Sequence, residues 1–314
     1  MLKLFYKLII LFVIFFFLDF IFGIVLGIIR DKSPDGRYYK VQYSLEKGNE
    51  DIVIFGASRA EVDLVPYIFE DSLKLTCWNA GRGNQTLPFW ICMQQGILNR
   101  YTPKIAIVDI PAEYLSKELV FEPAGLLRPF YSDHKEIRPI LNKISFFERY
   151  FIYSNLYAYN SSFYYLLRPY LLKGLDGKRE DKGWKPLSGQ MFNSASDQIT
   201  LNSNNSLNKE TLQLFNEFVS NFTKKGCKVF FVISPKFSEN IVSTSTIEYL
   251  KTMRDITLVN YDHNKLFTED YHYYRDPDHL NTEGAIKFTK IIAGKIRRVN
   301  GKFSTPSFNN ASIQ

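Results

Sequence analysis

The feature that most constrains this chain is an apolar run of 22 residues, Leu8 to Ile29, which a single charged residue, Asp19, interrupts. At about 1.5 Å per residue, a helix of that length crosses a hydrocarbon core of roughly 30 Å. A cleaved signal peptide has a shorter apolar core, usually about 7–15 residues, and ends in small residues. Here the run ends in Ile28-Ile29-Arg30, so we predict that residues 1–30 form an uncleaved transmembrane anchor.

The orientation of this anchor does not follow from the flanking charges. Basic residues lie on both sides of the run, at Lys3, Lys7, Arg30, Lys32, Arg37 and Lys40, so the positive-inside rule favours neither direction. An N-terminal anchor with a short leading tail commonly leaves the main domain outside. We therefore expect a single-pass membrane protein with its N-terminus in the cytoplasm and its main domain extracytoplasmic.

Three residues of the run, Asp19, Gly23 and Gly27, are spaced four positions apart and share one helical face. Glycines at this spacing allow another helix to approach closely, and a carboxyl inside a membrane is costly unless it faces a partner. We infer that this face docks against another membrane protein. The alternative is a tolerated, protonated Asp19 beside two incidental glycines.

After a polar segment at 31–48, expected to be a juxtamembrane linker, short apolar strands alternate with helices. Strands are predicted at 51–55, 73–78, 104–110, 227–233 and 256–260, and helices at 60–72, 87–98, 209–224, 245–254 and 281–298. Pro66 is expected to break or delay the first helix. This alternation predicts an α/β domain over 49–300 with a five-stranded parallel sheet covered on both faces, and a flexible tail at 301–314.

The alternation stops between residues 111 and 206, which we predict to be an insertion rich in aromatic residues. Its aromatic clusters include Phe130-Tyr131, Phe146-Phe147, Tyr150-Phe151 and Phe163-Tyr164-Tyr165. Burial against the sheet is the simplest interpretation of most of these rings. The alternatives are a cap over an acyl or sugar site and a surface that rests on the bilayer.

The net charge of +7 is spread along the chain without a block of like charges. We therefore expect a surface that tolerates lipid headgroups or acidic polymers, and no nucleic-acid partner. The cysteines, Cys77, Cys92 and Cys227, form neither a disulfide framework nor a metal motif. Histidines and acids near the C-terminus, among them His263 and His272, lack a fixed ligand spacing, so no metal and no cofactor is expected.

Two segments supply the residue types of nucleophilic catalysis. Gly56-Ala57-Ser58-Arg59 follows the first predicted strand, so Ser58 would open the next helix with its hydroxyl exposed and its N–H facing a developing oxyanion. Asp276-Pro277-Asp278-His279 precedes the last helix, and its spacing lets Asp276 hold Nδ1 of His279 while Nε2 points to the serine. The alternatives are a helix N-cap at Ser58, a solvated turn at the second segment, and Asp278 in place of Asp276.

A third segment, Asn79-Ala80-Gly81-Arg82-Gly83-Asn84, follows the second predicted strand. Sites in a parallel α/β sheet form at the carboxyl ends of the strands, so this loop would lie near Ser58. Its glycines let backbone amides approach a substrate, and Asn79 or Asn84 could donate to an oxyanion. Arg59 is a further candidate for substrate binding. The alternative is a tight turn between a strand and a helix.

Ser58 in a Gly-x-Ser block, Gly81 after the second strand, and Asp276 with His279 as Asp-x-x-His together resemble the SGNH/GDSL hydrolase superfamily. The match covers about residues 50–110 and 226–298. The resemblance implies a flavodoxin-like sheet, Ser58 as nucleophile, His279 as base and Asp276 as its partner. It also implies oxyanion donors from the backbone of Ser58 and Gly81.

The third block departs from the family pattern, which commonly has an Asn in Gly-x-Asn-Asp, because this chain reads Asp109-Ile110-Pro111-Ala112-Glu113 there. Losing an oxyanion donor can cost about 2.7–4 kcal/mol, so either Asn84 or another donor replaces it or the hole has two donors. A membrane helix and a missing third block are similar to the teichoic-acid D-alanyl-transfer and alginate O-acetylation proteins. These work beside membrane-bound O-acyltransferases, which the resemblance implies as a partner.

The resemblance favours a membrane-anchored, extracytoplasmic O-acyl esterase or acyltransferase that acts on a cell-surface glycan through an acyl-enzyme. Hydrolysis and transfer differ in whether water or a sugar hydroxyl resolves that intermediate. The alternative is a non-catalytic assembly protein of a membrane O-acyltransferase system. The missing third block supports the alternative, and the intact Ser, His and Asp argue against it.

Overall fold

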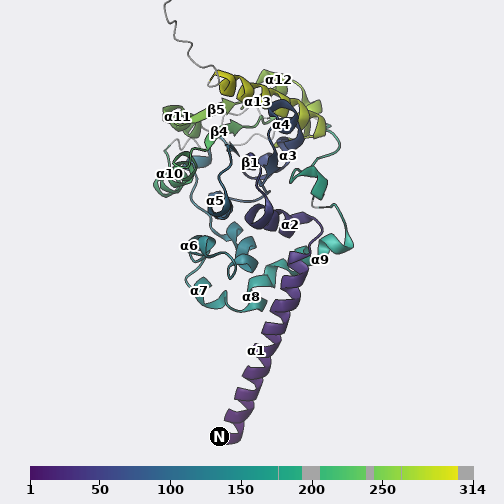
Figure 1. The fold of residues 1–314 in the computed structure, drawn as a ribbon, viewed down its shortest axis with the longest axis vertical. Coiled ribbons are helices and arrows are strands. Elements are labelled where there is room, and N and C mark those ends of the chain that lie inside the picture. The colour runs from purple at the N-terminus through teal and green to yellow at the C-terminus, as the bar shows by residue number, and fades with distance from the viewer. Residues whose placement is uncertain (176, 193–205, 238–243, 263, 303–314) are drawn as a thin grey trace, which may run out of the picture.

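The computed structural model describes residues 1–175, 177–192, 206–237, 244–262 and 264–302. Its centre is a five-stranded parallel sheet with the order β2-β1-β3-β4-β5 (Figure 1), which confirms the predicted α/β class and the five parallel strands. The strands are β1 Ile52–Phe55, β2 Cys77–Asn79, β3 Ile105–Asp109, β4 Lys228–Ile233 and β5 Ile256–Asn260. The predicted second strand starts too early, because a helix continues to Leu73.

The two faces of the sheet are buried in separate apolar layers. Successive residues of a strand point to opposite faces, and in β1 Val53 and Phe55 enter one layer while Ile52 and Ile54 enter the other. Helices α5 Leu87–Arg100, α10 Lys209–Thr223 and α11 Ser245–Thr252 contribute to the first layer. Helices α3 Ser58–Asp63, α4 Pro66–Leu73, α12 Lys265–Thr268 and α13 Thr282–Lys302 contribute to the second. This explains why the strands read as continuous apolar runs.

Pro66 separates α3 from α4, as predicted, and is the first residue of α4. Proline is tolerated at that position because the first N–H of a helix has no partner within the helix. The last helix, α13, begins after Asn281, whose Oδ1 accepts the N–H of Gly284 as an N-cap. Residues 303–314, most of the predicted tail, lie outside the described residues.

Residues 31–48 are not an extended linker. They contain α2 Gly36–Gln42 and a short π-helix, η1 Tyr43–Lys47. Tyr38, Val41 and Leu45 of these helices are fully buried in the first apolar layer. The turn signal in this segment conceals an apolar stripe too short for a periodicity argument, so the prediction of a linker is wrong. The chain after α1 is therefore part of the domain core.

The insertion forms short helices, of which α6, α7, α8 and α9 lie at the end of the domain from which α1 projects (Figure 1). They are η2 Tyr114–Ser116, η3 Glu122–Phe130, η4 Lys135–Ile137, α6 Arg138–Leu141, α7 Glu148–Phe151, α8 Asn155–Tyr159, η5 Asn160–Ser162, α9 Phe163–Leu171 and η6 Arg179–Asp181. Several of its rings are buried in the core, including Phe130 and Tyr131, as expected. Others, including Phe146 and Phe147, are exposed. The part of the predicted insertion at 193–205 lies outside the described residues.

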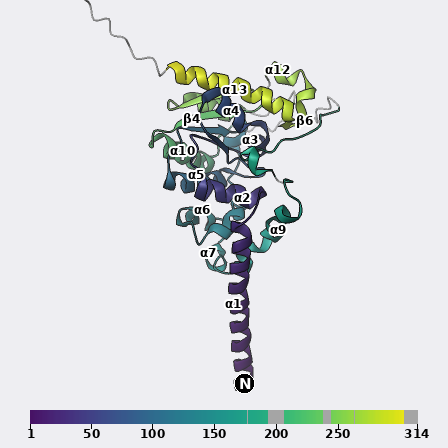
Figure 2. The same cartoon turned by 45° about the vertical axis from the view of Figure 1, so that its right-hand side comes forward.

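Helix α1, Leu2–Asp31, projects from the domain on the side opposite α12 and α13 (Figures 1 and 2). Among the described residues it is the one helix that is long and apolar enough to cross a membrane. Its side chains from Leu2 to Leu18 are all exposed, whereas Asp19, Leu26 and Arg30 are buried against the domain. The lower part of α1, Leu2 to Leu18, thus stands free of the domain, whereas its upper part, Asp19 to Asp31, packs against the domain on one side.

Candidate active site

Ser58 follows β1 at the topological switch point of the sheet, where the order of successive strands reverses. The strand order places β2 on one side of β1 and β3 on the other, and open α/β sheets bind ligands at the carboxyl ends of strands at such a point. Gly56 makes the turn that follows β1 with a φ of +142°, and a Cβ there would lie 2.7 Å from the carbonyl oxygen of Asp109. Only glycine fits this position. The turn delivers Ser58 as the first residue of α3.

The Ser58 side chain is not a helix cap. The N-cap of α3 is Ala57, and no side chain caps this helix. Instead, Ser58 Oγ lies 2.7 Å from His279 Nε2. This contact joins residues that are 221 positions apart, which is the arrangement of a nucleophile with its base.

His279 and Asp276 face each other across a small hairpin that the sequence did not reveal. Strands β6 Tyr274–Asp276 and β7 His279–Leu280 pair antiparallel, with Asp276 opposite His279. His279 Nδ1 lies 2.9 Å and 3.1 Å from the two carboxylate oxygens of Asp276. Asp276 Oδ1 also accepts the backbone N–H groups of Asp278 and His279. The hairpin therefore holds the carboxylate and the imidazole in one unit.

The geometry selects between the two candidate carboxylates. Asp278 does not bond to the His279 ring; its carboxylate lies 3.4 Å from Lys236 Nζ instead. A carboxylate at Nδ1 fixes the tautomer in which Nε2 has a free lone pair, and that lone pair can accept the proton of Ser58. Ser58, His279 and Asp276 thus form the chain of contacts that general-base activation of a serine requires.

A buried ion pair lies beneath this chain of contacts. Arg59, 5% exposed, places its Nε 3.5 Å from an Asp109 carboxylate oxygen, and Asp109 also accepts the N–H and hydroxyl of Ser234 after β4. Arg59 therefore connects α3 to the ends of β3 and β4, and its role in substrate binding stays a prediction. Its side chain points down to the sheet from the first turn of α3.

Asp63, at the end of α3, supports the hairpin from the same buried layer. Its Oδ1 accepts the N–H of Leu280, the residue next to His279, at 3.0 Å. Burial and then the nearby Asp109 raise the pKa of Asp63 well above its usual value. One short helix thus carries Ser58 at its start and, at its end, a carboxylate that supports the strand of His279.

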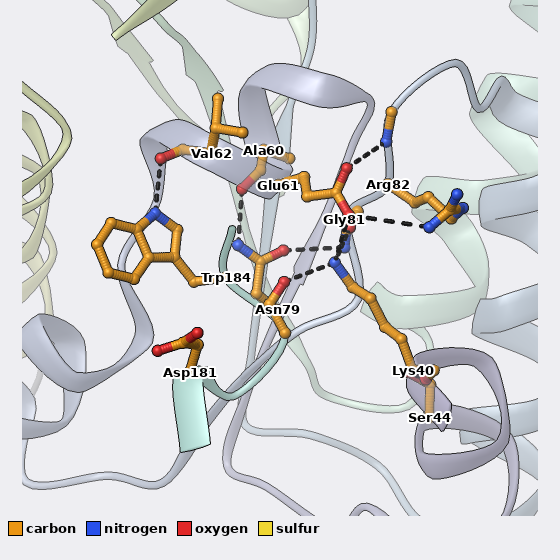
Figure 3. A network of polar contacts seen from close by, with 12 residues as sticks. Lys40, Ser44, Ala60, Glu61, Val62, Asn79, Gly81, Arg82, Asp181 and Trp184 are labelled. Atoms are coloured by element: carbon orange, nitrogen blue, oxygen red, sulfur yellow. Dashed lines mark hydrogen bonds and ion pairs between the residues drawn. The ribbon is translucent and has the colours of Figure 1, made fainter. Parts of the chain in front are cut away.

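The second-strand loop has a different organisation from the one predicted. Asn79 is fully buried; its Nδ2 donates to the carbonyl oxygens of Ala60 and Leu64, and its Oδ1 accepts the N–H of Gly81 at 3.0 Å (Figure 3). The N–H of Arg82 bonds to Gly56, and that of Gly83 bonds to Glu61. Asn79 is consequently a structural residue, and the amide of Gly81 is already bonded within the loop.

Lys40 of α2 holds the same loop from below (Figure 3). Its ammonium donates to the carbonyl oxygens of Gly81 and Gly183 and lies 3.4 Å from Glu61 Oε1. Burial lowers the pKa of Lys40 to about 8, although Glu61 acts in the opposite direction. Burial alone would raise the pKa of Glu61, but Lys40 and Arg82 lower it below its usual value. The segment that follows α1 thereby contacts the loop beside Ser58.

Two groups remain as candidate donors to an oxyanion. The N–H of Ser58 has no hydrogen-bond partner in the part of the chain that the structure describes. A Cβ on Gly83 would lie 3.7 Å from Ser58 Cβ, so the loop passes directly beside the nucleophile. The next residue, Asn84, is exposed and has a left-handed φ of 60°. The structure thus leaves the Ser58 amide and the Asn84 side chain as candidate donors.

Charged residues near Asp278 were not predicted from the sequence as part of the site. Lys236, three residues after β4, lies 3.9 Å from Glu113 of the third block and also pairs with Asp278. Burial would raise the pKa of Glu113, but Lys236 and Lys117 lower it. The rule that sites form at the carboxyl ends of strands could have found Lys236, since it follows the fourth strand. Nothing in the sequence pattern distinguished Lys40 or Glu61.

The Asp19 face of α1 has a partner within the same chain. The Asp19 carboxylate accepts the hydroxyl of Ser154 and the backbone N–H groups of Asn155 and Leu156, at the start of α8. Gly23 makes room for this contact, because a Cβ there would lie 2.3 Å from Asn155 Cγ. The Asp19 face is thus occupied without a second protein, and the prediction that Asp19 needs an external partner is wrong.

Cys77, Cys92 and Cys227 are buried free thiols. Within the described ranges, no group of three His, Cys, Asp or Glu side chains could hold a metal ion. His272 is exposed and lies 2.8 Å from Asp270. His263 lies outside the described residues. A search for related proteins finds no matching family model and no matching curated protein.

Proposed function

We propose that this protein is a membrane-anchored, extracytoplasmic SGNH-like serine O-acyl esterase or acyltransferase that modifies a cell-surface glycan. The observation that carries the proposal is the pair of contacts at His279, 2.7 Å to Ser58 Oγ and 2.9 Å to Asp276. The order of the parts also supports it. The serine follows the first strand, and the Asp and His precede the last helix, as in that superfamily.

The reaction proceeds through an ester on Ser58. His279 Nε2 takes the hydroxyl proton as Ser58 Oγ attacks the acyl carbonyl, and the carbonyl oxygen becomes an oxyanion held by the Ser58 N–H and Asn84. The tetrahedral intermediate collapses, the bond to the alkoxy group breaks, and His279 returns the proton to that group. Water or a sugar hydroxyl then attacks the acyl-enzyme, with His279 again as base. Asp276 stabilises the imidazolium and stays ionised.

The glycan and the membrane partner in this proposal come from the resemblance. Anchored members without the third-block Asn act beside membrane-bound O-acyltransferases, and this chain combines that departure with α1. The free lower part of α1, Leu2 to Leu18, is the surface left for such a partner, since Asp19 is already bonded to α8. Because the main domain is proposed to be extracytoplasmic, the N-terminus of α1 would lie in the cytoplasm.

A non-catalytic assembly protein is the second candidate, and one observation favours it. The amides of Gly81, Arg82 and Gly83 are all bonded within the chain, so the second-strand loop offers fewer donors than the family pattern implies. Removing one oxyanion donor typically costs about 10²–10³ in kcat. A protein with such a deficit could keep the fold and work through α1 alone.

The test is ester cleavage by the full-length protein in detergent or vesicles, because Leu26 and Arg30 of α1 pack into the domain. We expect wild type to cleave p-nitrophenyl acetate with a burst of one acetyl group per protein, and Ser58→Ala to lose the burst. Ser72→Ala, at the end of α4, is the matched control. Equal rates for folded wild type and Ser58→Ala would support the assembly protein. Faster turnover on adding an acceptor glycan would identify transfer.

A further inference from the structure

A group of exposed apolar side chains lies on the insertion, in and around α7 and at the start of α8. It consists of Phe146, Phe147, Tyr150, Phe151, Tyr153 and Leu156, each between 36% and 71% exposed. Neighbouring rings touch, with centroids 5.2 Å apart for Phe146 and Phe147 and 5.9 Å apart for Phe147 and Phe151. We call these six residues the aromatic surface. Exposed apolar patches of this kind mark interaction sites.

The segment that carries the aromatic surface contains few charged side chains, and each of them contacts other side chains of the protein. Residues 145–164 contain two charged side chains, Glu148 and Arg149. Glu148 is fully buried, where Arg128 donates to both of its carboxylate oxygens. Arg149 lies over the rings of Phe146 and Tyr150, 5.4 Å and 5.6 Å from their centroids. An arginine that can extend from aromatic rings toward headgroups is typical of a membrane interface.

The aromatic surface lies at the level of Asp19, in the middle of the apolar run of α1. The contacts of Asp19 with residues 154–156 fix the start of α8 at the level of Asp19, and Tyr159 at the other end of α8 approaches Gly27. Figure 1 shows α8 beside the upper part of α1, and α7 next to α8 at the same end of the domain. From Asp19 to Ile28 a helix rises about 14 Å.

At this same level the opposite face of α1 remains apolar and exposed. Ile21, Val25 and Ile28 are 39%, 46% and 50% exposed, and their spacing places them on the side of the helix away from Asp19 and α8. If the bilayer ended below α8, these side chains would face water. The apolar stretch left below Asp19, from Leu8 to Leu18, would span about 16 Å, half of a hydrocarbon core of roughly 30 Å.

We propose that α7 and α8 are embedded in the bilayer beside α1, with lipid as the occupant of the aromatic surface. The protein then has two membrane elements, one spanning helix and one segment that enters the near leaflet alone. Backbone groups in lipid need partners within the chain, and the Asp19 carboxylate supplies them for Asn155 and Leu156 at the exposed start of α8. This inference rests on the anchoring part of the proposed function and not on the catalytic residues.

Single cysteines labelled with the fluorophore NBD test this in full-length protein reconstituted into phosphatidylcholine vesicles. Phe147→Cys reports the aromatic surface, Ile14→Cys the free part of α1, and Leu266→Cys the opposite end of the domain, on α12 (Figure 1). Wild type is the labelling control, because its three cysteines are buried. Doxyl lipids and aqueous iodide serve as the quenchers. We expect Phe147→Cys to behave like Ile14→Cys, with blue-shifted emission quenched by doxyl lipid, and Leu266→Cys to be quenched by iodide.

Three other outcomes would overturn the inference, and each points elsewhere. Iodide quenching at Phe147→Cys with lipid quenching at Ile14→Cys would leave the anchor intact and put the aromatic surface in water. Protection of Phe147→Cys from both quenchers would mean that a second copy of the chain covers it. Iodide quenching at Ile14→Cys would remove the anchor and the embedded segment together, while ester cleavage would still test the catalytic residues independently.

Discussion

The two halves of the candidate site differ in how their parts are held. The nucleophile half consists of side chains that contact one another directly: Ser58, His279 and Asp276. The oxyanion half consists of the Ser58 N–H and the loop after β2, residues 80–84. In this loop backbone amides bond to neighbouring side chains, that of Gly81 to Asn79 and that of Gly83 to Glu61. Side-chain chemistry can be proposed from residue types and their order. Whether an amide is free depends on contacts that no spacing encodes.

The largest effect that would sharpen this comparison concerns the carboxylate of the nucleophile half. Asp276→Asn should lower the rate of acyl-enzyme formation by about 10²–10⁴, because an amide favours the wrong imidazole tautomer. Asp278→Asn is the matched control, since Asp278 pairs with Lys236 and not with His279. Pre-steady-state kinetics with p-nitrophenyl acetate measure both. Equal losses in the two variants would refute the assignment of Asp276.

The next effect concerns the oxyanion half. Asn84→Gly removes the side chain but keeps the left-handed backbone at φ 60°, which glycine adopts readily. If the Asn84 amide donates to the oxyanion, kcat should fall by about 10²–10³ with the Tm unchanged. Gln85→Ala, at the next position, is the control for general disturbance of the loop. An unchanged kcat in Asn84→Gly would leave Ser58 N–H as the donor and break the proposed role of Asn84.

A smaller effect tests the support under the nucleophile half. Asp63→Ala should lower the free energy of unfolding by about 1–3 kcal/mol, since it leaves the buried N–H of Leu280 without its acceptor. Asp63→Asn keeps an acceptor oxygen, and its neutral amide matches a carboxyl whose pKa is raised by burial. We therefore expect Asp63→Asn to remain near wild type. Thermal unfolding in detergent measures both, and equal destabilisation of the two variants would contradict this role.

A last effect, of about the same size as that of Asp63→Ala, tests the support under the oxyanion half through its pH dependence. The pKa of Lys40 is lowered to about 8 in the folded protein, against about 10.4 for an unperturbed lysine. Between these values the unfolded chain binds more protons, so the free energy of unfolding rises with pH by up to about 1.4 kcal/mol per pH unit. The advantage in Tm of wild type over Lys40→Met should therefore grow from about pH 8 to about pH 10.

The exposed Lys265→Met, on α12, is the control for Lys40→Met, and its Tm difference from wild type should not vary with pH in this way. Parallel curves of Tm against pH for wild type and Lys40→Met would show that Lys40 stays charged in the folded state from about pH 8 to about pH 10. The loop would then be held by a permanent ion pair with Glu61.

The sheet and the serine could be predicted because they depend on local patterns. Apolar strands such as Ile105–Asp109 are bounded by turns, and the order of strand, serine and helix places Ser58 at a strand end. The core packing of Tyr38 and Leu45 could not be predicted, since their helices are short and begin at a turn signal. The buried contacts of Asn79 and Arg59 could not be predicted, because the sequence shows only that both residues follow strands.

The central claim is that His279 activates Ser58, and the intact mass of the full-length protein after a fluorophosphonate probe tests it most directly. The account predicts one adduct on wild type and on Ser72→Ala, and none on Ser58→Ala or His279→Ala. Absence of an adduct on folded wild type, or an adduct that persists in Ser58→Ala, would contradict it.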